Sequence, residues 1–65
     1  MKERKYKYFV ADEGDGFYNA FAYADFNENG YYNGHDGEDG YHIDDFDIVF
    51  ECNHFIDACR WIEIN

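Results

Sequence analysis

The sequence predicts an α+β fold, in which a three-stranded antiparallel sheet carries one C-terminal helix in the order β-β-β-α. Three runs of strand-like apolar alternation precede residue 52, and an Asp-Gly turn sequence separates the first two. After residue 53 the apolar spacing lengthens to three and four residues, which is typical of an amphipathic helix. The 65 residues make a single small domain, residues 1–65, with fifteen aromatic side chains to fill its core.

The first predicted strand runs from Lys5 to Asp12 and is amphipathic. Tyr6, Tyr8 and Val10 alternate along it and are expected on one face. Residues 13–16 read Glu-Gly-Asp-Gly, and such residues tolerate the positive backbone angles of a tight hairpin. The strand is therefore expected to turn back directly into the next one.

The second run, residues 17–26, is apolar at both odd and even positions. Burial on two faces is typical of an interior strand, so this run is predicted to be the central strand. Residues 27–40 hold four of the six glycines and no branched aliphatic residue, which predicts an exposed loop. Within it, Tyr31 and Tyr32 either extend a strand or stand out as contact residues.

The third strand is predicted over residues 44–51, and the helix follows it. Even-numbered apolar residues of this strand are expected on one face and its acidic residues on the other. Asn53 is a favourable N-cap for the helix. The apolar residues that recur at helical spacing are Phe55, Ala58, Cys59 and Ile62, with Ile56 and Trp61 beside them.

Charge is sorted along the chain. Four of the five basic residues lie in the first seven positions. Of the fifteen acidic residues, only Glu3 precedes Tyr8, which leaves fourteen carboxylates between Tyr8 and Asn65 against one cation, Arg60. Because self-repulsion opposes folding, so many uncompensated carboxylates suggest a function. The simpler interpretation is a solvated acidic face that keeps an aromatic-rich protein in solution.

A carboxylate row can imitate nucleic-acid phosphates. Alternate strand residues such as Asp45 and Asp47 lie about 6.6–6.8 Å apart, and two nucleotides of a DNA strand advance about the same distance. A basic nucleic-acid-binding protein would bind such a row in place of its nucleic acid. We therefore expect this chain to bind a protein of that kind and not to bind nucleic acid directly. The expected contact residues are Tyr31, Tyr32, Asp36, Glu38, Asp39, Asp45, Asp47 and Glu51.

In size, net charge of −10 and expected β-β-β-α build, the chain resembles the small acidic inhibitors that phages encode against host defence. These include anti-CRISPR proteins and the DNA mimics that block restriction enzymes. The resemblance covers the whole chain but includes no shared motif. It implies a cytoplasmic, non-enzymatic inhibitor of a defence nuclease, acting in the host cell. An acidic accessory protein that binds a basic partner without imitating DNA is a further interpretation.

The alternative function is calcium binding. Residues 25–36 match the loop pattern D-x-[DN]-x-[DN]-G and are similar to EF-hand and dockerin loops. The expected oxygen ligands are Asp25, Asn27, Asn29, the Tyr31 carbonyl and Asp36, with Gly30 at the sharp turn. However, residues 36–40 cannot begin the helix that follows such loops in those families.

Other chemistry is poorly supported. Cys52, His54 and Cys59 match no common zinc spacing, and buried thiols are the simpler interpretation. The chain lacks Ser and Thr, so it has no hydroxyl nucleophile of that kind and no P-loop. Neither a membrane-spanning run nor a signal-peptide pattern is present in the sequence. We therefore expect a cytoplasmic protein without a cofactor that is not an enzyme, and an exposed edge strand makes a homodimer a further expectation.

Overall fold

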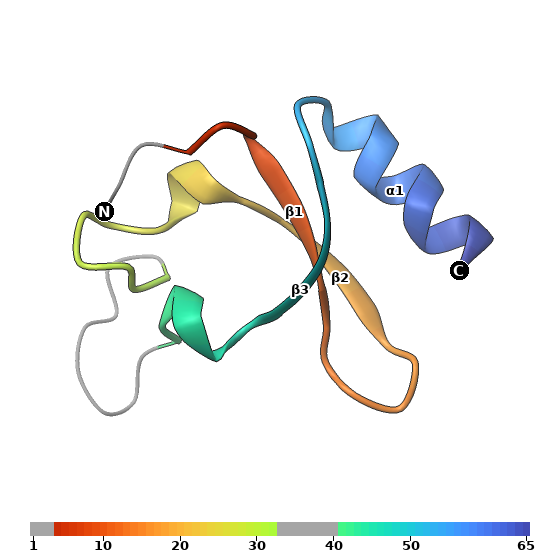
Figure 1. Cartoon of the computed structure of the whole chain (residues 1–65), viewed down its shortest axis with the longest axis horizontal. Helices are drawn as coiled ribbons and strands as arrows, with labels where there is room; N and C mark the ends of the chain where they lie inside the picture. Colours follow the sequence, from red (N-terminus) through yellow and green to blue (C-terminus); the bar gives the residue numbers. More distant parts are fainter. Residues whose placement is uncertain (1–3, 33–40) are drawn as a thin grey trace.

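The computed structural model describes residues 4–32 and 41–65 and confirms the predicted α+β architecture (Figure 1). An open antiparallel sheet of three strands carries one C-terminal helix packed against it. Two short 3₁₀ helices lie in the long connection between the second and third strands. The elements are β1 (Tyr8–Asp12), β2 (Tyr18–Ala22), η1 (Tyr23–Asp25), η2 (Ile43–Asp45), β3 (Asp47–Cys52) and α1 (Phe55–Ile64).

The central strand is β1, so the prediction of a central strand at residues 17–26 was wrong. The strand order is β2-β1-β3, which places β2 at an edge of the sheet. Three consecutive residues of β1, Phe9, Val10 and Ala11, are fully or almost fully buried. Burial of consecutive residues means that both faces of β1 are covered. The run after residue 17 instead leaves the sheet at Tyr23, where the backbone turns into η1.

A β-bulge in β3 divides its apolar residues between the two faces of the sheet. Val10 pairs with Phe50 whereas the next residue of β1, Ala11, pairs with Ile48, so Val49 has no partner. One extra residue in a strand turns all the following side chains to the opposite face. Ile48 therefore packs in one core and Phe50 in the other. The expectation that alternate apolar residues of residues 44–51 share one face is therefore incorrect. Residues 43–45 of that run are also helical rather than extended.

The sheet has a separate hydrophobic core on each face. The core under the helix, here called the helix-face core, contains the buried residues Val10, Cys52 and Ala58. Trp61 closes it by stacking on Phe50 of β3 with ring centroids 5.6 Å apart. Trp61 also meets Tyr18 of β2 edge to face at 5.0 Å, so the helix reaches across the whole sheet.

The opposite face holds a core built from rings, here called the aromatic core. Its buried residues are Phe9, Ala11, Tyr23, Phe26 and Ile43. The Phe9 ring lies 4.7 to 5.8 Å, between centroids, from four other rings, those of Phe21, Tyr23, Phe26 and Phe46. The connection between β2 and β3 covers this face, since η1 and η2 supply Tyr23 and Ile43. The second face of the sheet is thus covered without a regular helix.

The start of α1 also differs from the prediction. His54 occupies the N-cap position and its side chain makes no capping hydrogen bond. Asn53, the predicted cap, accepts a hydrogen bond of 3.2 Å from the backbone N–H of Lys7 through its Oδ1. This contact joins the segment before β1 to the β3–α1 junction. With ten residues, α1 is too short to cross a bilayer, and no other helix in residues 4–32 and 41–65 could do so.

Candidate functional site

The register of the sheet gathers carboxylates at one end. Asp12, the last residue of β1, lies directly opposite Asp47, the first residue of β3. The hairpin that follows Asp12 is closed by a bond from the Glu13 N–H to the Phe17 carbonyl, as its turn sequence predicted. We call the carboxylates of this hairpin and of the start of β3 the acidic end. Its members are Asp12, Glu13, Asp15, Asp45 and Asp47.

The sequence analysis missed the hairpin carboxylates because their position depends on register. Residues 12 and 47 are distant in the chain, and the central position of β1 is what brings them together. Basic residues lie beyond the other end of β1, where Lys7 directly precedes the strand. Lys7 and Asp12 are five positions apart, so an extended strand places them roughly 17 Å from one another at a rise of ~3.4 Å per residue. The N-terminal cations and the carboxylates of the acidic end thus lie at opposite ends of β1.

The predicted contact residues occupy different places. Asp45 and Asp47 are exposed at the acidic end, but Asp45 belongs to η2, so the two do not stand at strand spacing. Glu51 lies near the other end of β3, opposite Phe9. The remaining acidic members of the predicted set, Asp36, Glu38 and Asp39, lie outside the described residues.

Glu51 is bound to the aromatic core. The Tyr23 hydroxyl donates a hydrogen bond of 2.6 Å to Oε2 of Glu51. Burial, and then the hydrogen bond and the negative charge of Glu51, raise the pKa of Tyr23 well above its usual value, and Arg4 partly opposes this shift. The Arg4 guanidinium lies 4.9 Å from the centre of the Tyr23 ring. Among the predicted contacts, Glu51 therefore has a structural role.

Both loop tyrosines are half-buried. The Tyr32 ring meets Phe21 and Phe26 edge to face, at 5.8 and 5.3 Å between centroids, and its backbone bridges to Phe26. Tyr31 packs edge to face on the His42 ring at 4.8 Å. Tyr32 thereby extends the aromatic core, and Tyr31 braces the connection.

In the described part of the predicted calcium loop, residues 25–32, the chain folds as a tight turn that uses its own oxygens. Oδ1 of Asn27 accepts hydrogen bonds from the N–H groups of Asn29, at 3.0 Å, and Tyr31, at 2.9 Å. The Tyr31 carbonyl accepts the Asn27 N–H at 2.9 Å. In an EF-hand loop the oxygens at these two positions point at the ion. Asp25 is exposed in η1, and Asp36 lies outside the described residues.

A histidine completes this turn. Nδ1 of His42 accepts the Asp44 N–H at 3.1 Å, so Nε2 carries the proton and donates to the Asn29 carbonyl at 3.0 Å. Gly30, with φ of +90°, passes so close to His42 that a Cβ there would lie 2.7 Å from Nε2. Glycine is required at this position for both its backbone angle and its lack of a side chain.

The predicted thiol and histidine positions do not come together as a metal site. Cys52 is buried in the helix-face core, and its Sγ donates to the His54 carbonyl at 3.2 Å. Cys59 is a free, half-buried thiol on α1. Among residues 4–32 and 41–65, no three His, Cys, Asp or Glu side chains gather closely enough to hold a metal ion.

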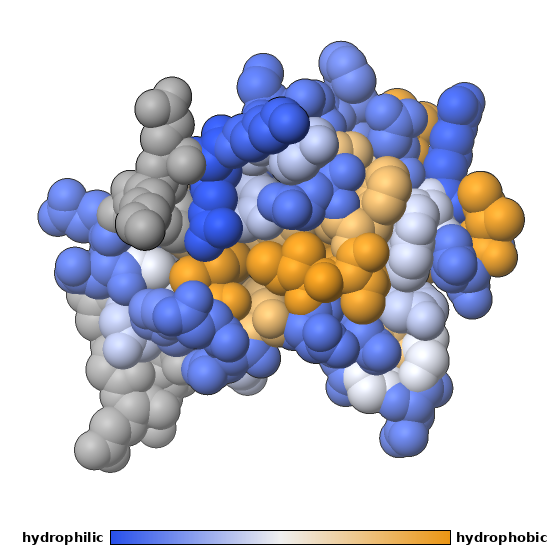
Figure 2. All heavy atoms as spheres, viewed as in Figure 1, coloured by the Kyte–Doolittle hydropathy of each residue, from blue (hydrophilic) through white to orange (hydrophobic). Residues whose placement is uncertain are grey.

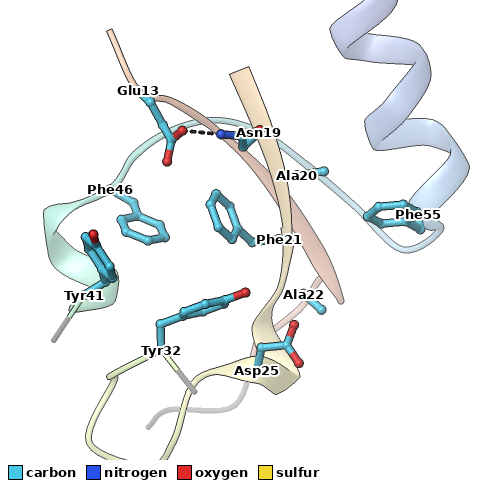
Figure 3. A pocket seen from close by; sticks show the side chains of 10 residues that line it. All are labelled: Glu13, Asn19, Ala20, Phe21, Ala22, Asp25, Tyr32, Tyr41, Phe46 and Phe55. Atoms are coloured by element: carbon cyan, nitrogen blue, oxygen red, sulfur yellow. Dashed lines mark hydrogen bonds between the residues drawn. The ribbon is translucent and has the colours of Figure 1, made fainter. Parts of the chain in front are cut away.

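A groove of about 580 Å³ follows the outer edge of β2 (Figure 3). Phe21, Tyr32, Tyr41 and Phe46 line it on the side of the aromatic core, and Ala20, Ala22 and Phe55 line it on the other. Glu13 and Asp25 lie at opposite ends of the groove, and Glu13 is hydrogen-bonded to Asn19 of β2 (Figure 3). The sequence analysis did not predict this groove.

Comparison with known proteins gives no independent indication of function. No protein-family model, curated protein or solved structure matches the chain.

Proposed function

We propose that this chain is a non-enzymatic binding protein whose acidic end docks into the nucleic-acid site of a basic partner and inhibits it. A defence nuclease of the CRISPR or restriction type is the kind of partner that the overall charge and size suggest. The site of action would be the cytoplasm. The observation that carries the proposal is the pairing of Asp12 with Asp47, which gathers carboxylates from two distant segments.

The electrostatics of the acidic end support this function. Like charges directly opposite one another across two strands are unfavourable for folding. Within the described residues, neither Asp45 nor Asp47 has a cationic partner, and both are exposed. A basic partner would relieve this repulsion on binding, and complementary charge also speeds association. Clustered carboxylates without cations are therefore better suited to binding than to stability.

The proposal can be tested by affinity capture from a bacterial lysate in EDTA, with a stepped salt wash and mass spectrometry. The expected result is a basic nucleic-acid-binding protein that is released by moderate salt and by added DNA or RNA. Release by salt but not by nucleic acid would indicate a basic partner bound outside its nucleic-acid site, and would contradict phosphate mimicry.

A pair of matched variants identifies the surface responsible. Asp45→Asn with Asp47→Asn removes two charges at the acidic end and should weaken capture without lowering the melting temperature. Asp57→Asn with Glu63→Gln removes two charges on α1, where both residues are exposed, and should leave capture unchanged. Equal losses in the two variants would attribute binding to net charge and exclude a specific role for the acidic end.

A further inference from the structure

The two edges of the sheet differ in how well they are protected against pairing with another strand. The outer edge of β3 carries the Val49 bulge and the charged residues Asp47 and Glu51. Bulges and charges are devices that prevent an edge from accepting a further strand. β2 pairs with β1 in unbroken register and has neither a bulge nor a charged residue between Tyr18 and Ala22. Only the β3 edge is protected in these ways.

Within residues 4–32 and 41–65, the outer edge of β2 also presents a regular row of backbone groups that have no backbone partner. The Tyr23 N–H donates to the Lys7 carbonyl at 2.9 Å, and the Glu13 N–H donates to Phe17 at 2.8 Å. Hydrogen bonding in an antiparallel pair alternates, so odd-numbered residues of β2 bond to β1. The N–H and C=O groups of Tyr18, Ala20 and Ala22 consequently point away from the sheet.

The groove beside this edge has apolar walls and acidic ends. Small side chains at Ala20 and Ala22 leave space on the helix side, while Phe21 and Phe46 form a wall on the aromatic side (Figure 3). Tyr41 at its rim is 65 % exposed, so it adds aromatic surface that an incoming chain would cover.

We infer that the β2 edge binds an extended peptide segment of a partner protein, with apolar side chains that alternate and a Lys or Arg at each end. The peptide would add a fourth strand, held by main-chain hydrogen bonds to Tyr18, Ala20 and Ala22. Its apolar side chains would enter the groove, and its cations would meet Glu13 and Asp25.

Charge complementarity excludes a second copy of this chain as the preferred occupant. Two β2 edges paired antiparallel would bring Glu13 of one copy towards Asp25 of the other, and each copy has a net charge of −10. Both effects oppose self-association. A basic segment gains from the same two carboxylates. The site is separate from the acidic end, apart from Glu13, so it does not depend on the function proposed above.

The test is selection of peptides from a random dodecapeptide display library on the immobilised full chain, followed by titration of a synthetic peptide from the selection. We expect enriched sequences with alternating apolar residues flanked by Lys or Arg. Ala20→Pro should reduce affinity about tenfold or more, because proline removes an outward N–H that does not bond to β1 and is tolerated at such edge positions. Asp45→Asn with Asp47→Asn should leave affinity unchanged, which separates this test from that of the acidic end.

A charge exchange adds a readout that misfolding cannot imitate. Asp25→Lys should shift the selected residue at one end of the peptide from basic to acidic. If Ala20→Pro does not fold, a peptide N-methylated at alternate residues replaces it, and methylation of the residues that face β2 should abolish binding. Peptides without alternation, or binding unaffected by either change, would overturn the inference. A wild-type dimer that Ala20→Pro converts to monomer in sedimentation would also overturn it, in favour of a second copy.

Discussion

The two faces of the sheet are covered in different ways, and the difference explains how so short a chain forms two cores. On one face, a regular helix places Ala58 and Trp61 over Val10. On the other, an irregular connection with two 3₁₀ turns places rings around Phe9. The helix is held by its own backbone hydrogen bonds, whereas the connection depends on side-chain bonds at Asn27 and His42. The aromatic face should therefore be the more sensitive to single substitutions.

Phe9→Ala should produce the largest loss of stability. The Phe9 ring is fully buried and lies at the centre of the aromatic core, so its removal should cost about 3–5 kcal/mol of unfolding free energy. The matched change on the helix face, Val10→Ala, removes two methyl groups and should cost roughly 2 kcal/mol. Urea denaturation measures both. A larger loss at Val10 than at Phe9 would reverse the ranking of the two faces.

Gly30→Ala tests the connection that covers the aromatic face. The new methyl group would displace His42 and break its bond to the Asn29 carbonyl, at a cost of about 2–4 kcal/mol together with the backbone strain. Gly16 provides the control, since its φ of +80° is similar but no atom lies within 4 Å of its would-be Cβ. Gly16→Ala should cost only about 1–2 kcal/mol. Equal losses in thermal melts would show that the His42 contact does not stabilise the fold.

Tyr23→Phe should remove the hydrogen bond to Glu51 and cost about 1.5–3 kcal/mol at neutral pH. Because the pKa of Tyr23 is raised in the folded chain, the stability that Tyr23 contributes depends on pH. Below about pH 10 the hydroxyl is protonated in the folded and the unfolded chain, and the contribution is complete. Above that pH the unfolded chain releases its proton first, so stability falls as pH rises.

Alkaline denaturation followed by circular dichroism checks this sign. Between pH 9 and 11 the wild type should lose more stability than Tyr23→Phe, which lacks the titrating group. Glu51→Gln keeps an acceptor without the charge and should fall between the two. Parallel decreases in all three proteins would mean that Tyr23 does not contribute to the alkaline transition.

Asp47→Asn should have a smaller effect of opposite sign. Removing one of the two opposed carboxylates should raise the unfolding free energy by about 0.2–1 kcal/mol, and added salt should reduce the gain. Asp57→Asn is the control, because Asp57 lies in the first turn of α1, where negative charge is favourable. It should lower stability slightly. A loss at Asp47 would indicate that the acidic end is not under repulsion.

The smallest expected effect is that of calcium. Since Asn27 Oδ1 and the Tyr31 carbonyl already accept backbone hydrogen bonds, calcium should not raise the melting temperature above that in magnesium chloride of equal concentration. A calcium-specific rise that Asp25→Ala abolishes would contradict this prediction and restore the loop as a metal site.

The helix face was predictable because its signals are local. The helix at α1 and the turn at residues 13–16 each depend on neighbours in the sequence, and both were found. Of the predicted apolar stripe, Ala58 and Ile62 pack on the sheet, but Phe55 is exposed and Trp61 packs there. The strand order was not predictable in this way, since Phe9, Val10 and Ala11 form a short apolar run whose burial depends on what packs above and below. The aromatic face lacked any periodic signal, because irregular backbone places its rings.

The candidate site was predicted in part for the same reason. Asp45 and Asp47 were assigned from their strand pattern, but their partner Asp12 depends on register. Glu51 was assigned to a row of carboxylates that the bulge interrupts, and its hydrogen bond from Tyr23 depends on contacts that no local pattern shows. The β2 groove combines residues from four segments, so no local pattern in the sequence indicates it.

Apolar surface is exposed over β3 (Figure 2). In this strand, Val49 has no partner in β1, and this extra residue bears on how the length of the chain can vary. Deletion of Val49 would leave every other pairing of β1 with β3 intact, because Ile48 and Phe50 already oppose consecutive residues. Deletion of Ile48 or Phe50 would let Val49 take the vacated position, whereas deletion of Glu51, outside the bulge, would turn Phe50 over to the opposite core. The bulge at Val49 is thus the place in this strand where relatives one residue shorter are expected to differ.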